Sequence, residues 1–128
     1  MDDFRRPIEE TLLEMEESVR EEHALDAVLI QNGFFYESYL DSATYLHRVL
    51  GYKTAIGLYG QLMTGAPPGS LKTCIVTIEG QGGRVGVLEQ VEKIKTKMLR
   101  ELKYVTGHSI LNIDNLKIEY LPDIDDSN

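Results

Sequence analysis

The hydrophobic pattern is organised around an apolar run, residues 27–30 (AVLI), that stops at Asn32-Gly33. A short apolar run bounded by a turn signal is typical of a buried strand. Aromatic residues follow the turn, and Asp41 then begins a stretch with apolar residues at helical spacing: Ala43, Leu46, Val49 and Leu50. Gly51 comes next, where a glycine commonly ends a helix. The pattern therefore predicts a strand, an aromatic turn and a helix.

An amphipathic helix is predicted ahead of this unit, over residues 7–22. Its apolar positions recur at helical spacing: Ile8, Leu12, Met15 and Val19. Pro7 suits a first helical position, and early glutamates suit the positive end of the helix dipole. The glutamates are placed on the rest of its surface: Glu9, Glu10, Glu14, Glu16, Glu17, Glu21 and Glu22. They form either a solvated face or a docking surface for a basic partner.

The middle of the chain gives a less uniform pattern. Residues 52–59 alternate and predict a strand, whereas the glycines and prolines of residues 60–69 predict a loop. The β-branched residues 73–78 have strand propensity. The same region also fits a helical stripe through Leu71, Cys74, Ile75 and Ile78. Both interpretations are open, and we favour the helix.

A strand is predicted over residues 85–91, and helical spacing resumes beyond it at Val91, Ile94, Met98 and Leu102. The basic residues of this region form a cluster: Lys93, Lys95, Lys97, Arg100 and Lys103. Such a cluster suits contacts with phosphates or with an acidic patch on a partner, or it is simply a solvated face. Residues 110–120 predict a final strand region. We expect one domain over residues 1–121 and a disordered acidic tail over residues 122–128.

The aromatic turn, Gly33-Phe34-Phe35-Tyr36-Glu37, resembles the Gly-Asp-Phe-Tyr-Glu motif of the N-terminal mismatch-recognition domain of the MutS mismatch-repair family. Phe34 stands where the family has an acid. Further blocks are similar in the same order: Gly65-Ala66-Pro67, Arg84 to Glu92 and Arg100 to Thr106. The resemblance covers roughly residues 8–116. It implies a single α/β domain with a mixed β-sheet flanked by helices, a helix within residues 70–80, and a strand that begins near Arg100.

In that family the Phe of the motif wedges beside a mispaired base and the Glu hydrogen-bonds to that base. The resemblance places these roles on Phe35 and Glu37. Alternation along a strand puts Phe35 and Glu37 on one face and Phe34 and Tyr36 on the other. We therefore expect Phe35 and Glu37 to be accessible together at one edge of the sheet. The expected core is Val28, Ile30, Leu46, Leu50, Val85 and Val87. Without the resemblance, an aromatic cluster at a strand end is typical of a core.

The net charge of −8 is unevenly distributed along the 128 residues. Residues 1–22 hold nine acids and three arginines (−6), residues 119–128 hold four acids (−4), and residues 23–118 therefore carry +2. Acidic ends repel phosphate, so strong unaided binding to duplex DNA is not expected. A basic protein partner, such as a polymerase or reverse transcriptase, suits this charge better. The resemblance adds one candidate, because small stand-alone domains of this type are associated with the reverse transcriptases of diversity-generating retroelements.

Other chemistry is weakly indicated. The histidines lack ligand spacing, Cys74 is the single cysteine, and no constellation of catalytic residues stands out. Residues 60–65 have the glycine spacing of a phosphate-binding loop but lack its lysine. We expect a cytoplasmic protein that is not an enzyme and uses no metal or cofactor. The favoured function is a mismatch-sensing accessory module that binds nucleic acid. The alternative is a protein-interaction adaptor that keeps the fold without nucleic-acid binding.

Overall fold

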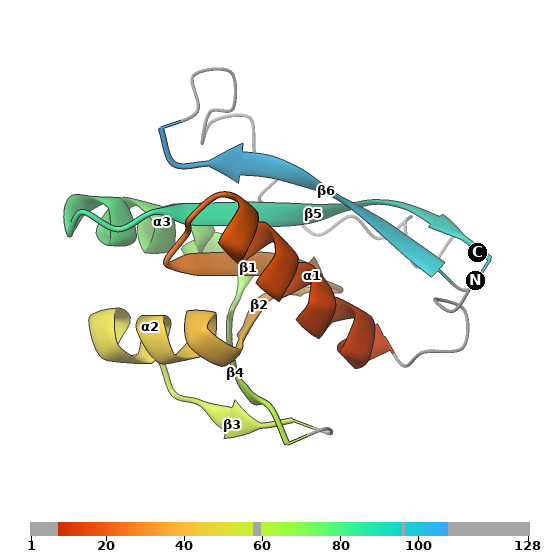
Figure 1. The fold of residues 1–128 in the computed structure, drawn as a ribbon, viewed down its shortest axis with the longest axis horizontal. Helices are drawn as coiled ribbons and strands as arrows, with labels where there is room; N and C mark the ends of the chain where they lie inside the picture. The colour runs from red at the N-terminus through yellow and green to blue at the C-terminus, as the bar shows by residue number, and fades with distance from the viewer. Residues whose placement is uncertain (1–7, 58–59, 96, 108–128) are drawn as a thin grey trace.

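The computed structural model describes residues 8–57, 60–95 and 97–107. Within them the chain forms one six-stranded sheet with helices on both faces (Figure 1). The elements in chain order are α1 (Ile8–Glu22), β1 (Ala27–Asn32), β2 (Phe35–Tyr39), α2 (Leu40–Leu50), β3 (Ala55–Ile56), β4 (Leu62–Ala66), the 3-10 turn η2 (Pro68–Ser70), α3 (Leu71–Gly80), β5 (Val85–Ile94) and β6 (Lys97–Val105).

The sheet is mixed, with strand order β3-β4-β2-β1-β5-β6. Strands β1 and β5 are parallel, and every other neighbouring pair is antiparallel. The hairpin β1–β2 therefore lies in the middle of the sheet. This arrangement confirms the predicted α/β class and mixed sheet.

The two faces of the sheet carry separate apolar clusters. On one face α1 packs through Leu12 against Val28, Ile30 and Tyr39, and α1 lies in front of β1 in Figure 1. On the other face α2 and α3 pack against alternate residues of the same strands, including Leu29, Tyr36 and Val87. Because successive strand residues point to opposite faces, strands buried on both faces read as continuous apolar runs. The apolar run of residues 27–30 is such a strand.

Several predicted elements are confirmed. The helix predicted over residues 7–22 is α1, the helix after Asp41 is α2, and the region left open at residues 70–80 is the helix α3. Gly51 ends α2 with a left-handed φ of 75°. Of the expected core residues, Leu50 is only partly buried and the others are fully buried.

The helix predicted over residues 91–102 is wrong. This stretch belongs to the hairpin β5–β6, in which Lys93 pairs with Met98 and Lys95 turns the chain with a φ of 57°. Among the residues at helical spacing whose side chains the structure describes, Leu102 packs beneath α1, whereas Val91 and Met98 are partly buried and belong to neither apolar cluster. The backbone of this stretch pairs between β5 and β6 instead of forming helical hydrogen bonds. The strand near Arg100 that the family resemblance implies is thereby confirmed.

The middle of the chain also differs from the prediction. The strand expected over residues 52–59 is only Ala55–Ile56 within the described part, and β4 lies inside the predicted loop. Gly65 suggested a loop, yet it pairs with Glu37 between two strands, where backbone pairing outweighs its low strand propensity. The strand expected over residues 110–120 and the tail lie outside the described residues.

A buried carboxylate joins α1 to the rest of the fold. Glu16 is fully buried, and its Oε2 accepts hydrogen bonds from Arg20 Nε at 2.8 Å and from Ser42 Oγ at 2.6 Å. The same hydroxyl of Ser42 accepts from the backbone N–H of Val28 at 2.8 Å. One polar chain therefore links α1, α2 and β1. Glu16 was expected on the helix surface with its neighbours, and that expectation is wrong.

Candidate nucleic-acid interface

Phe35 is presented by a tight turn between β1 and β2. Asn32 pairs with Phe35, so Gly33 and Phe34 form a two-residue loop, and Gly33 has a φ of 65°. Glycine at the first loop position is the usual choice in such hairpins because it accepts positive φ without strain. Phe35 is 51% exposed and Phe34 is 60% exposed. Two aromatic side chains therefore lie in solvent at the end of a central hairpin.

The expected position at a sheet edge is wrong, because β2 lies between β1 and β4. Phe35 is accessible because it is the first residue of β2, at the end of the hairpin. Phe34 was expected to share the inner face with Tyr36, but it belongs to the turn and is exposed. The expected exposure of Phe35 is confirmed.

Tyr36 points to the opposite face from Phe35 and anchors β2 in the core. It is fully buried, and its hydroxyl donates to Glu89 Oε2 at 3.1 Å. Burial, together with the adjacent Glu89 carboxylate, raises the pKa of Tyr36 well above its ordinary value. The hydroxyl therefore stays protonated as a donor. Tyr36 therefore packs in the core, whereas the neighbouring Phe35 lies in solvent.

Glu37 shares the face of Phe35 but is half-buried, so the expectation of joint exposure holds fully only for Phe35. Its Oε1 accepts hydrogen bonds from Asn32 Nδ2 at 3.2 Å and from the Tyr39 hydroxyl. Its partner across the β2–β4 ladder is Gly65, which is exposed. A Cβ at Gly65 would lie 3.8 Å from Glu37 Cγ. Because glycine has no side chain, nothing from position 65 covers the carboxylate.

A second set of hydrogen bonds holds the turn, and these come from side chains of β5 and β6. Arg100 Nε donates to the carbonyl oxygen of Gln31 at 2.7 Å, and Arg100 Nη2 donates to Asn32 Oδ1 at 3.4 Å. Gln90 Oε1 accepts from the Gly33 N–H at 2.8 Å. The end of β1 is therefore tied to both β5 and β6. Arg100, which the sequence suggested as a phosphate contact, is half-buried and contacts the turn with its guanidinium.

The remaining basic residues follow the far part of the β5–β6 hairpin. The paired register of β1 with β5 ends at Leu88, and we call the part beyond it, residues 89–101, the ribbon. In Figure 1 the β5–β6 hairpin extends to the right, away from α3. Lys93 and Lys95 are exposed at its end, and Lys97 begins β6. Lys103 follows the ribbon in β6 and forms an ion pair with Glu101 at 3.0 Å. The predicted basic cluster is thus divided along a hairpin.

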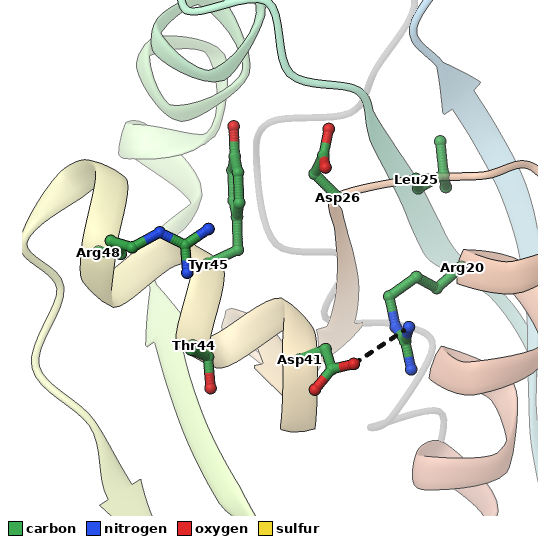
Figure 2. Close-up of a pocket in the computed structure, with 7 residues that line it drawn as sticks. All are labelled: Arg20, Leu25, Asp26, Asp41, Thr44, Tyr45 and Arg48. Carbon is green, nitrogen blue, oxygen red and sulfur yellow. Dashed lines mark ion pairs between the residues drawn. The ribbon is translucent and has the colours of Figure 1, made fainter.

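A pocket of about 320 Å³ lies where α1, α2 and the start of β1 meet (Figure 2). It is lined by Arg20, Leu25, Asp26, Asp41, Thr44, Tyr45 and Arg48. Figure 2 shows Arg20 facing Asp41, at 3.5 Å, and the Arg48 guanidinium carbon is 5.6 Å from the centre of the Tyr45 ring. Its two arginines are balanced by two aspartates. The pocket precedes β1, whereas the aromatic turn follows it, so the two lie at opposite ends of that strand.

Other reactive chemistry is sparse in the described part of the chain. There, no three His, Cys, Asp or Glu side chains lie close enough to hold a metal ion. Cys74 is buried, and burial raises the pKa of its thiol, which lowers its reactivity. None of the described helices is long and apolar enough to cross a membrane.

Sequence reasoning missed the residues that lie beside Glu37, Asn32 and Gly65, and the residue that holds the turn, Gln90. Asn32 and Gly65 read as turn and loop residues, and Gln90 carried no signal of its own. Their roles depend on strand register, since Asn32 pairs with Phe35 and Gly65 pairs with Glu37. The Asn32-Gly33 dipeptide did mark a hairpin, and placing a two-residue loop there would have brought Asn32 beside the motif.

A family model described as MutS domain I matches residues 12–113 of the chain. The match includes the aromatic turn, Gly65 and the ribbon. No curated protein matches the chain at significant similarity.

Proposed function

This chain belongs to the MutS domain I family, and from that premise we propose that it senses mispaired or distorted base steps in nucleic acid. The observation that supports this most is Phe35, an aromatic side chain 51% exposed at the hairpin end and two residues from Glu37 on the same strand face. An exposed aromatic ring can stack on a base or wedge between base steps. A carboxylate beside it can hydrogen-bond to the displaced base. We assign Phe35 as the wedge and Glu37 as the base contact.

The ribbon is the proposed contact with phosphates. Lys93 and Lys95 are exposed, and Lys97 lies in the same hairpin. Arg100 links the base of the ribbon to Asn32, so the lysines and the wedge belong to one connected unit. Few phosphates can be neutralised by so small a set of cations. Binding to a perfect duplex should therefore be weak and salt-dependent.

The test is fluorescence anisotropy with matched duplex DNA and with the same duplex carrying one mispair, at about 50 mM salt, where electrostatic binding is strong. Because unstacking is least costly at a mispaired base, the mispaired duplex should bind about tenfold more tightly, which corresponds to one stacked base. Equal affinity for the two duplexes would contradict the sensing function.

We further propose that the domain works by binding, as an accessory to a larger basic protein such as a polymerase or reverse transcriptase. The support is the charge of α1, whose exposed positions include Glu14, Glu17, Glu21 and Glu22. Opposite charges accelerate encounter and favour the correct partner. The acidic face lies on an element that packs on the same side of the sheet as Glu37. A basic partner docked there would also reduce the repulsion of phosphates.

The accessory role predicts a specific effect of charge reversal. Changing Glu14, Glu17, Glu21 and Glu22 to lysine should abolish recovery of a basic, nucleic-acid-handling protein in a pull-down from native lysate, identified by mass spectrometry. The α1 core is untouched, so circular dichroism should be unchanged. Recovery of the same partner at the same salt by the reversed protein would place the docking surface elsewhere. Recovery without any preference for mispaired DNA would favour the adaptor function.

A further inference from the structure

Two consecutive phenylalanines, Phe34 and Phe35, are exposed at the end of the β1–β2 hairpin. Phe34 is 60% exposed and Phe35 is 51% exposed, and neither belongs to an apolar core cluster. The other large apolar side chains exposed in the described residues, Ile56 and Val76, lie singly on β3 and α3. Single exposed apolar residues are ordinary, whereas contiguous apolar surface marks an interaction site. The wedge role proposed for Phe35 leaves the exposure of Phe34 unexplained.

The turn that carries the two rings is held by β5. The Gly33 N–H donates to Gln90 Oε1 at 2.8 Å. Within the two-residue loop only Gly33 has a positive φ, 65°, so Phe34 carries its ring without backbone strain. Rings presented from a fixed turn lose only side-chain freedom when they bind a ligand. Such preorganisation favours affinity.

Successive bases of a nucleic-acid strand have a spacing similar to that of successive residues. Consecutive Cα atoms are about 3.8 Å apart, and stacked nucleotides rise by about 3.4 Å along a strand. Phe34 lies in the loop, outside the alternation that directs Tyr36 into the core, so both exposed rings emerge from the same end of the hairpin. A nucleic-acid strand that crosses this end can place one base on each ring. Every base has a π-face, so this stacking requires no particular sequence.

The charges of the chain favour a single strand over a duplex. The net charge is −8, and the exposed cations Lys93 and Lys95 lie at the far end of the ribbon. Lys93 follows Gln90 on β5 within about 10 Å of extended chain, close enough to the turn for a neighbouring phosphate. A single strand carries about half the charge of a duplex per unit length, so acidic surfaces repel it less. Stacking must then supply much of the affinity.

We propose that Phe34 and Phe35 together form a stacking platform for single-stranded nucleic acid, on which two successive unpaired bases bind, with Lys93 as a phosphate contact. The ligand class is an unpaired strand of any sequence, which goes beyond the sensing of mispaired steps in a duplex. The platform shares Phe35 with the sensing function but does not depend on it. In a mispaired duplex the bases that flank the lesion stay stacked in the helix, so no second base face is open to Phe34.

The probe is a fluorescent thymidine oligonucleotide of about ten residues, within the usual span of a single-strand site. Thymine does not pair with itself, so the strand stays single. In anisotropy titrations at about 50 mM salt, the wild-type protein should bind it. Phe34→Ala and Phe35→Ala should each weaken this binding by about tenfold, the effect of one stacked base. An absence of binding by the wild-type protein, or unchanged affinity in Phe34→Ala, would overturn the proposal.

Further substitutions separate stacking from apolar contact. Phe34→Tyr keeps an aromatic face and should bind the oligonucleotide within about twofold of the wild type. Phe34→Leu keeps an apolar side chain without the ring and should bind as weakly as Phe34→Ala. Val76→Ala, a change at an exposed apolar residue on α3, should leave the affinity unchanged. Wild-type affinity in Phe34→Leu would show that the ring is not stacked and would overturn the platform.

The phosphate contact has its own readout. Lys93→Gln should reduce the slope of log affinity against log salt by about 0.7, the value for one phosphate of a single strand. Phe34→Ala should leave this slope unchanged while it lowers the affinity. An unchanged slope in Lys93→Gln would overturn the contact assigned to Lys93.

The outcomes distinguish the platform from the sensing function. If the oligonucleotide requires both rings but mispaired duplex binds no better than matched duplex, the platform stands and the sensing function fails. If mispaired duplex is preferred and oligonucleotide binding is insensitive to Phe34, the sensing function stands and the platform fails. If Phe34→Ala loses only a protein partner in the pull-down and keeps the oligonucleotide, Phe34 is a protein contact and the platform fails.

Discussion

Phe35→Ala is expected to bind mispaired duplex no more tightly than matched duplex. The phenyl ring is the group proposed to stack at the distorted step, and its removal should cost about 1–3 kcal/mol of binding free energy per stacked base. Stability should change by less than about 0.5 kcal/mol, because the ring is half exposed and outside both core clusters. Anisotropy titrations of both duplexes, with urea denaturation of the variant, give the two quantities.

Phe34→Ala is the matched control for this variant. Phe34 is the preceding residue, has the same side chain and is 60% exposed, but it belongs to the turn and precedes the strand. It should keep the preference for mispaired duplex. If Phe34→Ala loses the preference while Phe35→Ala keeps it, the wedge has been assigned to the wrong aromatic residue.

Unlike Phe35→Ala, Tyr36→Ala should lose much of its stability. The ring is fully buried in the apolar cluster between the sheet and the helices α2 and α3. Truncation of a buried aromatic typically costs about 3–5 kcal/mol. It also removes the hydroxyl that donates to Glu89, which is itself 1% exposed. Urea denaturation should show the loss as a lower midpoint. A variant as stable as the wild type would contradict the burial of this ring.

Tyr36→Phe isolates the hydroxyl from the ring. It keeps the packing and leaves the Glu89 carboxylate without this donor, at a cost of about 1–3 kcal/mol. Taken with Phe35→Ala, these variants test the alternation of the motif, since adjacent residues should affect binding and stability separately.

The sequence was most informative where local pattern and burial agree. Residues 27–30 are apolar because β1 is buried on both faces, and Gly51 ends α2 because that position needs a left-handed φ. Twofold alternation places Phe35 and Tyr36 on opposite faces of the sheet, and the position of Phe35 at the hairpin end leaves it exposed. The Phe and Glu of the motif could therefore be placed on one face before the fold was known.

What could not be predicted depends on pairing between distant segments. The stretch 91–102 has apolar residues at helical spacing, but it folds as a hairpin that pairs along its length. Gly65 lies in a strand because β2 pairs with it, against its own propensity. Arg100 appeared to be a surface cation in the sequence, and only the approach of β6 to the end of β1 shows that it contacts Asn32. Glu16 likewise lies in the core, where Arg20 and Ser42 donate to its Oε2.

The most direct measurement of the central claim is the fluorescence of 2-aminopurine placed beside the mispaired base, since stacking quenches this base analogue and unstacking restores its emission. If Phe35 enters the distorted step, saturating wild-type protein should raise the emission, whereas Phe35→Ala at equal occupancy should not. The matched duplex should show no rise with either protein. Equal emission with wild-type protein and Phe35→Ala, both bound to the mispaired duplex, would contradict the account.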